Sequence, residues 1–357
     1  MKKTKISMPP TNPARLSIVH TLRGPAALMV AWFHFVKCGP LDLGIFKLTA
    51  PEGIYGVIIF YVISGFVLPY SLWKGGYVLA DYGRFILKRI ARLDPPYFAS
   101  IAIVLSAAYL ATLSPLYRGV PFSVSGSQLL LHIGYLNAFF GKPWINGVYW
   151  TLAIEFQYYL ILGLVFPLLR SGNRLFFATF VALCATSQYI FFKATFLPYN
   201  WPLFLMGIVV FRHKASIVKA SETIAWLTIF CCWAAFEMTA ARAAVGAMGA
   251  LSIMYLAYEN RVTTFLGNIS YSLYLLHVPI GGKIVNLGSR YATNPWSELF
   301  VAAVAMFVTI VCAYAMYRWI EKPAQQLAGR IRYRAEASFH RPVASTVHRL
   351  EPELAPE

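Results

Sequence analysis

An arginine and a histidine, Arg23 and His34, stand eleven positions apart in the first long apolar segment of the chain. At about 100° and 1.5 Å per helical residue, both side chains lie on one helix face, roughly 16 Å apart along the axis. An arginine at mid-membrane depth costs roughly 2.5–3.5 kcal/mol on translocon scales, so it usually faces a substrate or proton path. Histidine can transfer protons near neutral pH. The structural alternative is that Arg23 reaches the interface and His34 is a hydrogen-bonded core residue.

Two more ionisable side chains interrupt segments that otherwise resemble apolar helices. Glu155 lies about nine residues inside its segment and must be paired, protonated or exposed to a wet cavity. His277 is followed by Pro279, where a helix kink is expected to expose backbone carbonyls. A functional role is the stronger interpretation for Glu155, whereas a structural role is equally consistent with the position of His277.

An Arg-x-x-Arg pair, Arg89 and Arg92, directly precedes the sequence Leu-Asp-Pro-Pro-Tyr. Residues three apart share a helix face, so the two guanidiniums could bind one polyanion such as a pyrophosphate. By spacing alone, anchors that follow the positive-inside rule are the favoured interpretation. Ser64 and Gly65 are expected to permit close helix packing. A nucleophilic Ser64 is the minor alternative, because the sequence shows no neighbouring base.

The composition indicates what kind of structure positions these side chains. Of 357 residues, 58% are hydrophobic and only 13% are charged, whereas soluble proteins carry about 25% charged residues. Apolar runs of about 20 residues predict an all-α, polytopic membrane bundle of about ten transmembrane helices. The predicted spans are 16–36, 54–72, 95–113, 146–169, 174–192, 197–211, 221–238, 241–258, 265–288 and 297–320.

The basic residues predict an orientation. A formal net charge of +17 would suggest a nucleic-acid partner in a soluble chain. Here Lys and Arg concentrate in alternate loops, on the side that both chain ends share. The positive-inside rule therefore predicts both termini in the cytoplasm and no nucleic-acid partner. Segment 73–94 is expected to lie as an amphipathic helix at the inner surface, and 114–145 to form an outer interfacial helix or a lid.

The chain is expected to form one membrane unit, residues 16–327. A cytoplasmic N-terminus, 1–15, precedes it, and a tail, 328–357, follows it. The tail is basic and then rich in Glu and Pro, which is typical of disorder. The five cysteines show neither a disulfide framework nor zinc-site spacing, and we expect no metal site.

Taken in chain order, these residues resemble the acyltransferase type 3 family of integral-membrane O-acyltransferases. Six family motifs occur in family order: Arg23 with His34, Phe60 to Phe66, Arg89 and Arg92 with Pro95 and Tyr97, Trp150 to Glu155, Ser270 to His277, and Tyr317 to Pro323. The fourth motif departs in one position, where Thr151 replaces the usual serine. Six motifs in order are far more specific than any one of them.

The resemblance implies a multi-pass enzyme of the bacterial inner membrane. It would move an acyl group, with acetyl as the first candidate, from cytoplasmic acyl-CoA to a hydroxyl of a carbohydrate or glycolipid acceptor. Arg89 and Arg92 would bind the CoA phosphates. The Arg23-to-His34 rise is comparable to an extended pantetheine arm, so a CoA held from inside could present its thioester near His34.

The resemblance also implies roles for the other residues. His34 would act as general base on the acceptor hydroxyl. Glu155 would orient the imidazole or stabilise its cation, and Arg23 would stabilise the thioester oxyanion or bind CoA. His277 would complete the catalytic group.

Other functions stay open at this stage. A transporter or flippase would use Arg23, Glu155 and His277 as a substrate or proton relay and would consume no acyl-CoA. A non-catalytic scaffold ranks last, because it leaves these polar groups without a purpose. Direct transfer and an acyl-histidine intermediate both fit the sequence. So do a monomer and a homo-oligomer.

Overall fold

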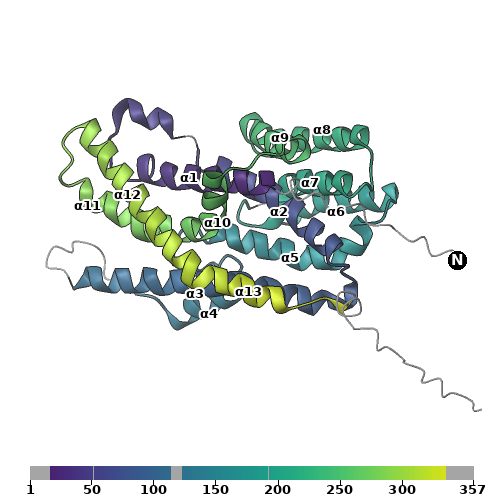
Figure 1. Cartoon of the computed structure of the whole chain (residues 1–357), viewed down its shortest axis with the longest axis horizontal. Helices are drawn as coiled ribbons and strands as arrows, with labels where there is room; N and C mark the ends of the chain where they lie inside the picture. Colours follow the sequence, from purple (N-terminus) through teal and green to yellow (C-terminus); the bar gives the residue numbers. More distant parts are fainter. Residues whose placement is uncertain (1–16, 51, 114–122, 192, 335–357) are drawn as a thin grey trace, which may run out of the picture.

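The computed structural model describes residues 17–334, except 51, 114–122 and 192. The regular elements of this part of the chain are all helical, and no strand occurs in it (Figure 1). The α-helices are α1 (Ser17–Val36), α2 (Ile54–Lys74), α3 (Tyr82–Thr112), α4 (Gly126–Ile133), α5 (Trp150–Leu169), α6 (Arg174–Ile190), α7 (Leu197–Lys214), α8 (Ala220–Glu237), α9 (Ala240–Tyr255), α10 (Arg261–Leu276), α11 (Lys283–Gly288), α12 (Pro295–Met316) and α13 (Lys322–Arg330).

The all-α prediction is confirmed for this part of the chain. Four helical segments within it are long and apolar enough to cross a membrane, namely Gly44–Lys74, Leu79–Thr112, Trp150–Leu169 and Pro295–Arg330. Helices α6 and α9 are apolar but shorter. The count of ten spans and the cytoplasmic termini stay predictions. The segment 1–15 and most of the predicted tail, from residue 335 onward, lie outside the described residues.

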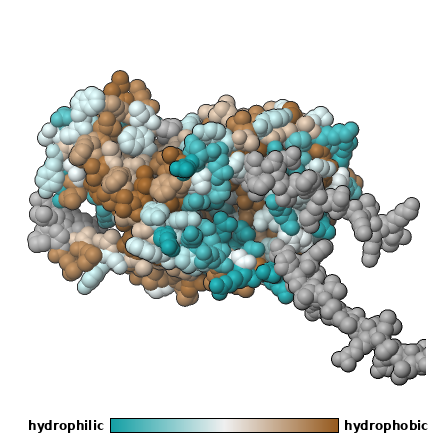
Figure 2. Space-filling view, viewed as in Figure 1, coloured by the Kyte–Doolittle hydropathy of each residue, from teal (hydrophilic) through white to brown (hydrophobic). Residues whose placement is uncertain are grey.

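The molecular surface fits a lipid environment. Large apolar side chains are exposed on many helices, among them Phe236 at 87% and Trp319 at 75%. Contiguous exposed apolar surface is rare on soluble monomers and marks membrane contact. Figure 2 shows wide hydrophobic areas, whereas hydrophilic residues gather over α13 and the adjoining part of α3. The chain is therefore a membrane protein.

Helix α3 differs from the prediction, because no break separates an inner helix at 73–94 from a span at 95–113. It runs from Tyr82 to Thr112 through the adjacent prolines Pro95 and Pro96. Proline removes one backbone hydrogen bond, but packing against neighbouring helices makes proline tolerable in membrane helices. Here the buried Tyr97 stacks on Tyr135 at a ring distance of 4.8 Å. Arg89 and Arg92 consequently lie on the same rigid element as the span.

The segment predicted as an outer interfacial helix or lid, 114–145, contains the short helix α4. Its first part, 114–122, lies outside the described residues. Ser125 caps α4 by accepting a hydrogen bond from the backbone N–H of Gln128 at 3.2 Å. Leu130 and Ile133 are 70% and 60% exposed, so α4 presents apolar side chains outward as an interfacial helix does.

Glycines bring α1, α2 and α7 into close contact. Helix α1 packs against α2 and α10, and α2 packs against α7. A Cβ on Gly56 would collide with the carbonyl oxygen of Ala26, and one on Gly65 with that of Phe204. Gly53 lies against Phe33, so α1 and α2 run antiparallel. The packing role predicted for Gly65 is thus confirmed, and the middle of α2 faces the Arg23 end of α1.

Two π-helical segments interrupt the C-terminal helices. Residues His277–Gly282 join α10 to α11, and residues Tyr317–Glu321 join α12 to α13. Pro279 lies in the first of them, where the sequence predicts a kink. π-helical turns are rare and often occur at functional sites. These two segments carry His277 and Glu321, which are both buried.

Candidate active site

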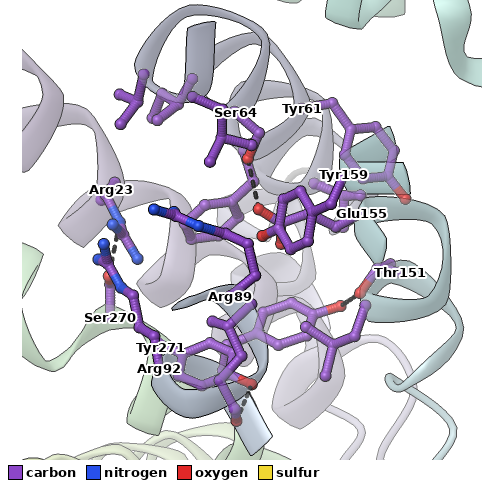
Figure 3. A pocket seen from close by; sticks show the side chains of 18 of the residues that line it. Arg23, Tyr61, Ser64, Arg89, Arg92, Thr151, Glu155, Tyr159, Ser270 and Tyr271 are labelled. Atoms are coloured by element: carbon purple, nitrogen blue, oxygen red, sulfur yellow. Dashed lines mark hydrogen bonds between the residues drawn. The ribbon is translucent and has the colours of Figure 1, made fainter. Parts of the chain in front are cut away.

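A cavity of about 90 Å³ lies among helices α1, α2, α3, α5 and α10 (Figure 3). Its charged lining consists of three arginines and two carboxylic acids: Arg23 from α1, Arg89 and Arg92 from α3, Glu155 from α5, and Glu321 from the second π-helical segment. The structure therefore brings four of the six predicted site residues into one cavity. The two predicted histidines do not line it.

The three arginines share this cavity without forming ion pairs. Within the described residues, none of Arg23, Arg89 and Arg92 makes a salt bridge. Arg23 Nε donates to Ser270 Oγ at 3.2 Å. Arg89 is only 6% exposed, its guanidinium carbon lies 5.6 Å from the Phe85 ring centroid, and its Nε has no hydrogen-bond partner.

Buried charges are normally paired, so three guanidiniums without carboxylate partners make this cavity suited to an anion. The spacing of Arg89 and Arg92 places both on one face of α3. Figure 3 shows their side chains and that of Arg23 directed into the same space. Guanidiniums bind phosphate oxygens through paired N–H donors, so this geometry can hold a polyanion.

Glu155 faces the arginines but bonds to a serine. Ser64 Oγ donates to Glu155 Oε1 at 2.7 Å, and Tyr159 lies beside the same carboxylate (Figure 3). The sequence shows no base near Ser64, but the structure places the Glu155 carboxylate of α5 within hydrogen-bonding distance of its hydroxyl. The absence of a base is therefore no argument against Ser64. In the described residues no hydrogen bond joins Glu155 to His34. Glu155 therefore does not orient the imidazole in this structure.

Glu321 was not predicted as a site residue, although it lies in the last family motif. It is 3% exposed, and its Oε2 accepts hydrogen bonds from Ser272 Oγ at 2.6 Å and from the Ser272 N–H at 3.2 Å. Gln325 Nε2 donates to its other oxygen at 2.9 Å. In the sequence, Glu321 is a single acidic residue directly after an apolar run, and this could have marked it as a candidate site residue. With this second carboxylate, the cavity holds three cationic and two acidic side chains.

His34 and His277 form a hydrogen-bonded pair. His34 Nδ1 lies 2.8 Å from the Val30 carbonyl and 3.3 Å from His277 Nε2. His277 Nδ1 lies 2.7 Å from the Tyr274 carbonyl. A carbonyl can only accept, so both Nδ1 atoms are assigned the proton when the rings are neutral. His34 then shares its N–H with His277 Nε2, and its own Nε2 keeps a lone pair.

This arrangement gives His34 the tautomer that a general base needs. Within the described residues no group hydrogen-bonds to His34 Nε2. The Nδ1–H of His34 is accepted by Nε2 of His277, which is fully buried. This hydrogen bond fixes the orientation of the His34 imidazole. This is the role that the sequence analysis gave to Glu155.

The histidine pair lies beyond one wall of the cavity. Tyr274 forms part of that wall, and its ring centroid is 5.6 Å from that of His277. The Tyr274 hydroxyl is 2.6 Å from Thr151 Oγ1, another lining residue. His34 stands at the far end of α1, roughly 16 Å along the axis from Arg23. The candidate site therefore has two parts, the arginine cavity and the histidine pair, and helix α1 connects them.

The sequence is similar to those of several known proteins. A profile of the acyltransferase domain (acyltransferase 3) matches residues 17–318. A putative acetyltransferase, ORF330, of Acidianus two-tailed virus is 28% identical over 286 residues, which cover 72% of this chain and 81% of that protein. Nodulation protein 10 of Rhizobium leguminosarum is 26% identical over 316 residues, 76% of this chain and 82% of that protein.

The peptidoglycan O-acetyltransferase OatA of Listeria monocytogenes is 23% identical over 334 residues, 78% of this chain and 52% of that protein. No solved structure matches this chain. The domain match covers most of the chain, including the histidine pair and every charged residue of the cavity except Glu321. The chain belongs to the acyltransferase 3 family and is an O-acetyltransferase-like membrane enzyme.

Proposed function

We propose that this enzyme transfers an acyl group, with acetyl as the first candidate, from cytoplasmic acyl-CoA to a hydroxyl of a carbohydrate or glycolipid acceptor. The observation that carries this proposal is the cavity in which three arginines outnumber two carboxylic acids and form no ion pair with them. Arg89 and Arg92 bind the CoA diphosphate from one face of α3. The enzyme works in the inner membrane of a bacterium, with both termini in the cytoplasm.

Arg23 belongs to the donor-binding group in this proposal. The sequence left two roles for it, binding CoA and stabilising the thioester oxyanion. Its guanidinium bonds to Ser270 in the cavity, whereas His34 is roughly 16 Å further along α1. Stabilisation of an oxyanion requires donors about 2.7–3.1 Å from the developing charge. Arg23 is therefore assigned to the CoA, whose pantetheine arm spans the distance to His34.

Transfer takes place at the histidine pair. His34 Nε2 accepts the proton of the acceptor hydroxyl while the hydroxyl oxygen attacks the carbonyl carbon of the thioester. The carbon–sulfur bond breaks, the new ester forms, and the CoA thiolate takes the proton from the imidazolium. His277 stabilises this cation through the shared Nδ1–H. An acyl-histidine intermediate is the alternative route.

The acceptor class rests on the relatives. One relative is named a peptidoglycan O-acetyltransferase and is 23% identical to this chain, which supports a carbohydrate hydroxyl as acceptor. No cluster of three or more potential metal ligands occurs in the described residues, and the proposed transfer uses none.

The test uses purified protein in lipid nanodiscs with radiolabelled acetyl-CoA and envelope polysaccharide from a host strain that lacks this protein. Wild-type protein should label the polysaccharide, and His34→Gln should lower the rate at least about hundredfold. His213→Gln, a histidine of α7 outside the cavity, serves as the matched control and should keep wild-type turnover. Equal turnover by His34→Gln and wild type would refute the role of His34 as general base. If neither wild type nor any variant labels the polysaccharide, the proposed transferase function is refuted.

A further inference from the structure

A second cavity, of about 360 Å³, opens where α2 ends and α3 begins. Lys74 and Tyr70 of α2, Lys88 of α3, and Tyr333, which follows α13, form most of its lining. No acidic side chain lines it. The Lys74 ammonium lies 5.3 Å from the Tyr70 ring centroid, and the Lys88 ammonium lies 5.2 Å from that of Tyr333. Two cations therefore flank one space, each over an aromatic ring.

The second cavity adjoins the first. Val67 lines both of them, and Lys88 directly precedes Arg89 in α3. Ser64, Val67 and Lys74 follow one face of α2 at helical spacing. Lys74 is ten positions beyond Ser64, or roughly 15 Å along the axis. A ligand held at Lys74 can thus extend past Val67 toward the arginines.

The wall that carries Tyr333 is fixed in place by contacts with the α2–α3 connection. The Arg334 N–H donates to Asp81 Oδ1 at 3.2 Å, and Asp81 is fully buried. A Cβ on Gly75 would lie 2.8 Å from the Tyr333 ring, so glycine is needed for this close approach. The ring of Tyr77 meets that of Tyr333 edge to face at 5.6 Å. The second cavity is therefore built by segments far apart in the chain.

We propose that Lys74 and Lys88 bind the phosphate monoester on the ribose of CoA, the 3′-phosphate. This inference rests on the proposed function, because it adds a second phosphate subsite to the donor path. The order of groups in CoA matches the order of cations, with the ribose phosphate at the lysines, the diphosphate at Arg89 and Arg92, and the pantetheine arm beyond them.

The test compares acetyl-CoA with 3′-dephospho-acetyl-CoA, which lacks only the proposed ligand group. Lys74→Met and Lys88→Met remove each charge and keep an unbranched stem. Each should raise the KM for acetyl-CoA about three- to fivefold, in line with a partly exposed ion pair, and should leave kcat and the KM for the dephospho donor unchanged. Lys219→Met, an exposed lysine outside both cavities, should change neither KM. Adenosine 3′,5′-bisphosphate should inhibit wild type more strongly than either cavity variant.

The outcomes separate the two proposals. If neither donor supports transfer, the proposed function fails. If wild type uses both donors with the same KM, or if the variants raise both KM values equally, the 3′-phosphate subsite is refuted and the transferase stands. A lipid headgroup carries the same phosphate chemistry. If the variants lose bound phosphatidylglycerol in native mass spectrometry yet still discriminate between the donors, the lysines bind lipid and the proposal is refuted.

Discussion

Replacing His277 by phenylalanine separates the orientation of the base from the binding of the donor. In the structure, the Nδ1–H of His34 is shared between the Val30 carbonyl at 2.8 Å and His277 Nε2 at 3.3 Å. When His34 accepts a proton at Nε2, both hydrogen bonds become charge-assisted. A hydrogen bond contributes about 1.5–3 kcal/mol to a charged group and about 0.5–1.5 kcal/mol to a neutral one. Only this increase of about 1–1.5 kcal/mol affects the rate, and each 1.36 kcal/mol is about tenfold. His277→Phe should therefore lower kcat about five- to tenfold.

The defect should fall on kcat alone, because His277 does not line the arginine cavity. The Val30 bond persists in the variant, so the loss should be smaller than that of His34→Gln. His277→Gln offers an amide oxygen as acceptor and should recover part of the rate. The assay is steady-state transfer from acetyl-CoA, with thermal unfolding as a check on folding. A well-folded His277→Phe protein with wild-type kcat, or with a raised KM for acetyl-CoA and normal kcat, would refute the reasoning.

Three further predictions concern the cavity and its helices. Arg89→Ala and Arg92→Ala should each raise the KM for acetyl-CoA about tenfold or more, because each removes a charge-assisted phosphate contact; an unchanged KM in steady-state assays would remove them from the donor site. Ser64→Ala should keep activity within about threefold if the hydroxyl only positions the carboxylate of α5; a hundredfold loss, with an acetylated Ser64 in mass spectra of wild type, would show a nucleophile instead. Gly65→Leu should lower the unfolding temperature by several degrees or abolish expression, because a side chain there meets the backbone of α7; unchanged thermal unfolding would contradict the close crossing.

Local spacing predicted the shared face of Arg89 and Arg92 correctly, whereas of the pair Arg23 and His34 only Arg23 lines the cavity. The i, i+3 relation of Arg89 and Arg92 and the helical phase of Arg23 depend only on helix geometry. The cavity indeed receives all three side chains. Periodicity also predicted that the chain is a bundle of apolar helices, because transmembrane length and composition are local properties.

Pairings between distant helices were beyond sequence reasoning. Ser64 and Glu155 are 91 positions apart, and His34 and His277 are 243 apart. Which side chain meets which depends on helix rotation and crossing, and no single segment encodes these. From the sequence we therefore expected Glu155 to orient the His34 imidazole, whereas in the structure His277 makes that contact. The π-helical turn at Glu321 also escaped prediction, because one extra residue per turn leaves no clear compositional signal.

The most direct measurement is a structure of the enzyme with an acetyl-CoA analogue whose sulfur is replaced to prevent transfer. We expect the diphosphate at Arg89 and Arg92 and the acyl carbon beside His34 Nε2, with room for one hydroxyl oxygen roughly 3 Å from the carbon and from the nitrogen. An acyl group that stays in the arginine cavity, or a donor bound elsewhere on the protein, would contradict it.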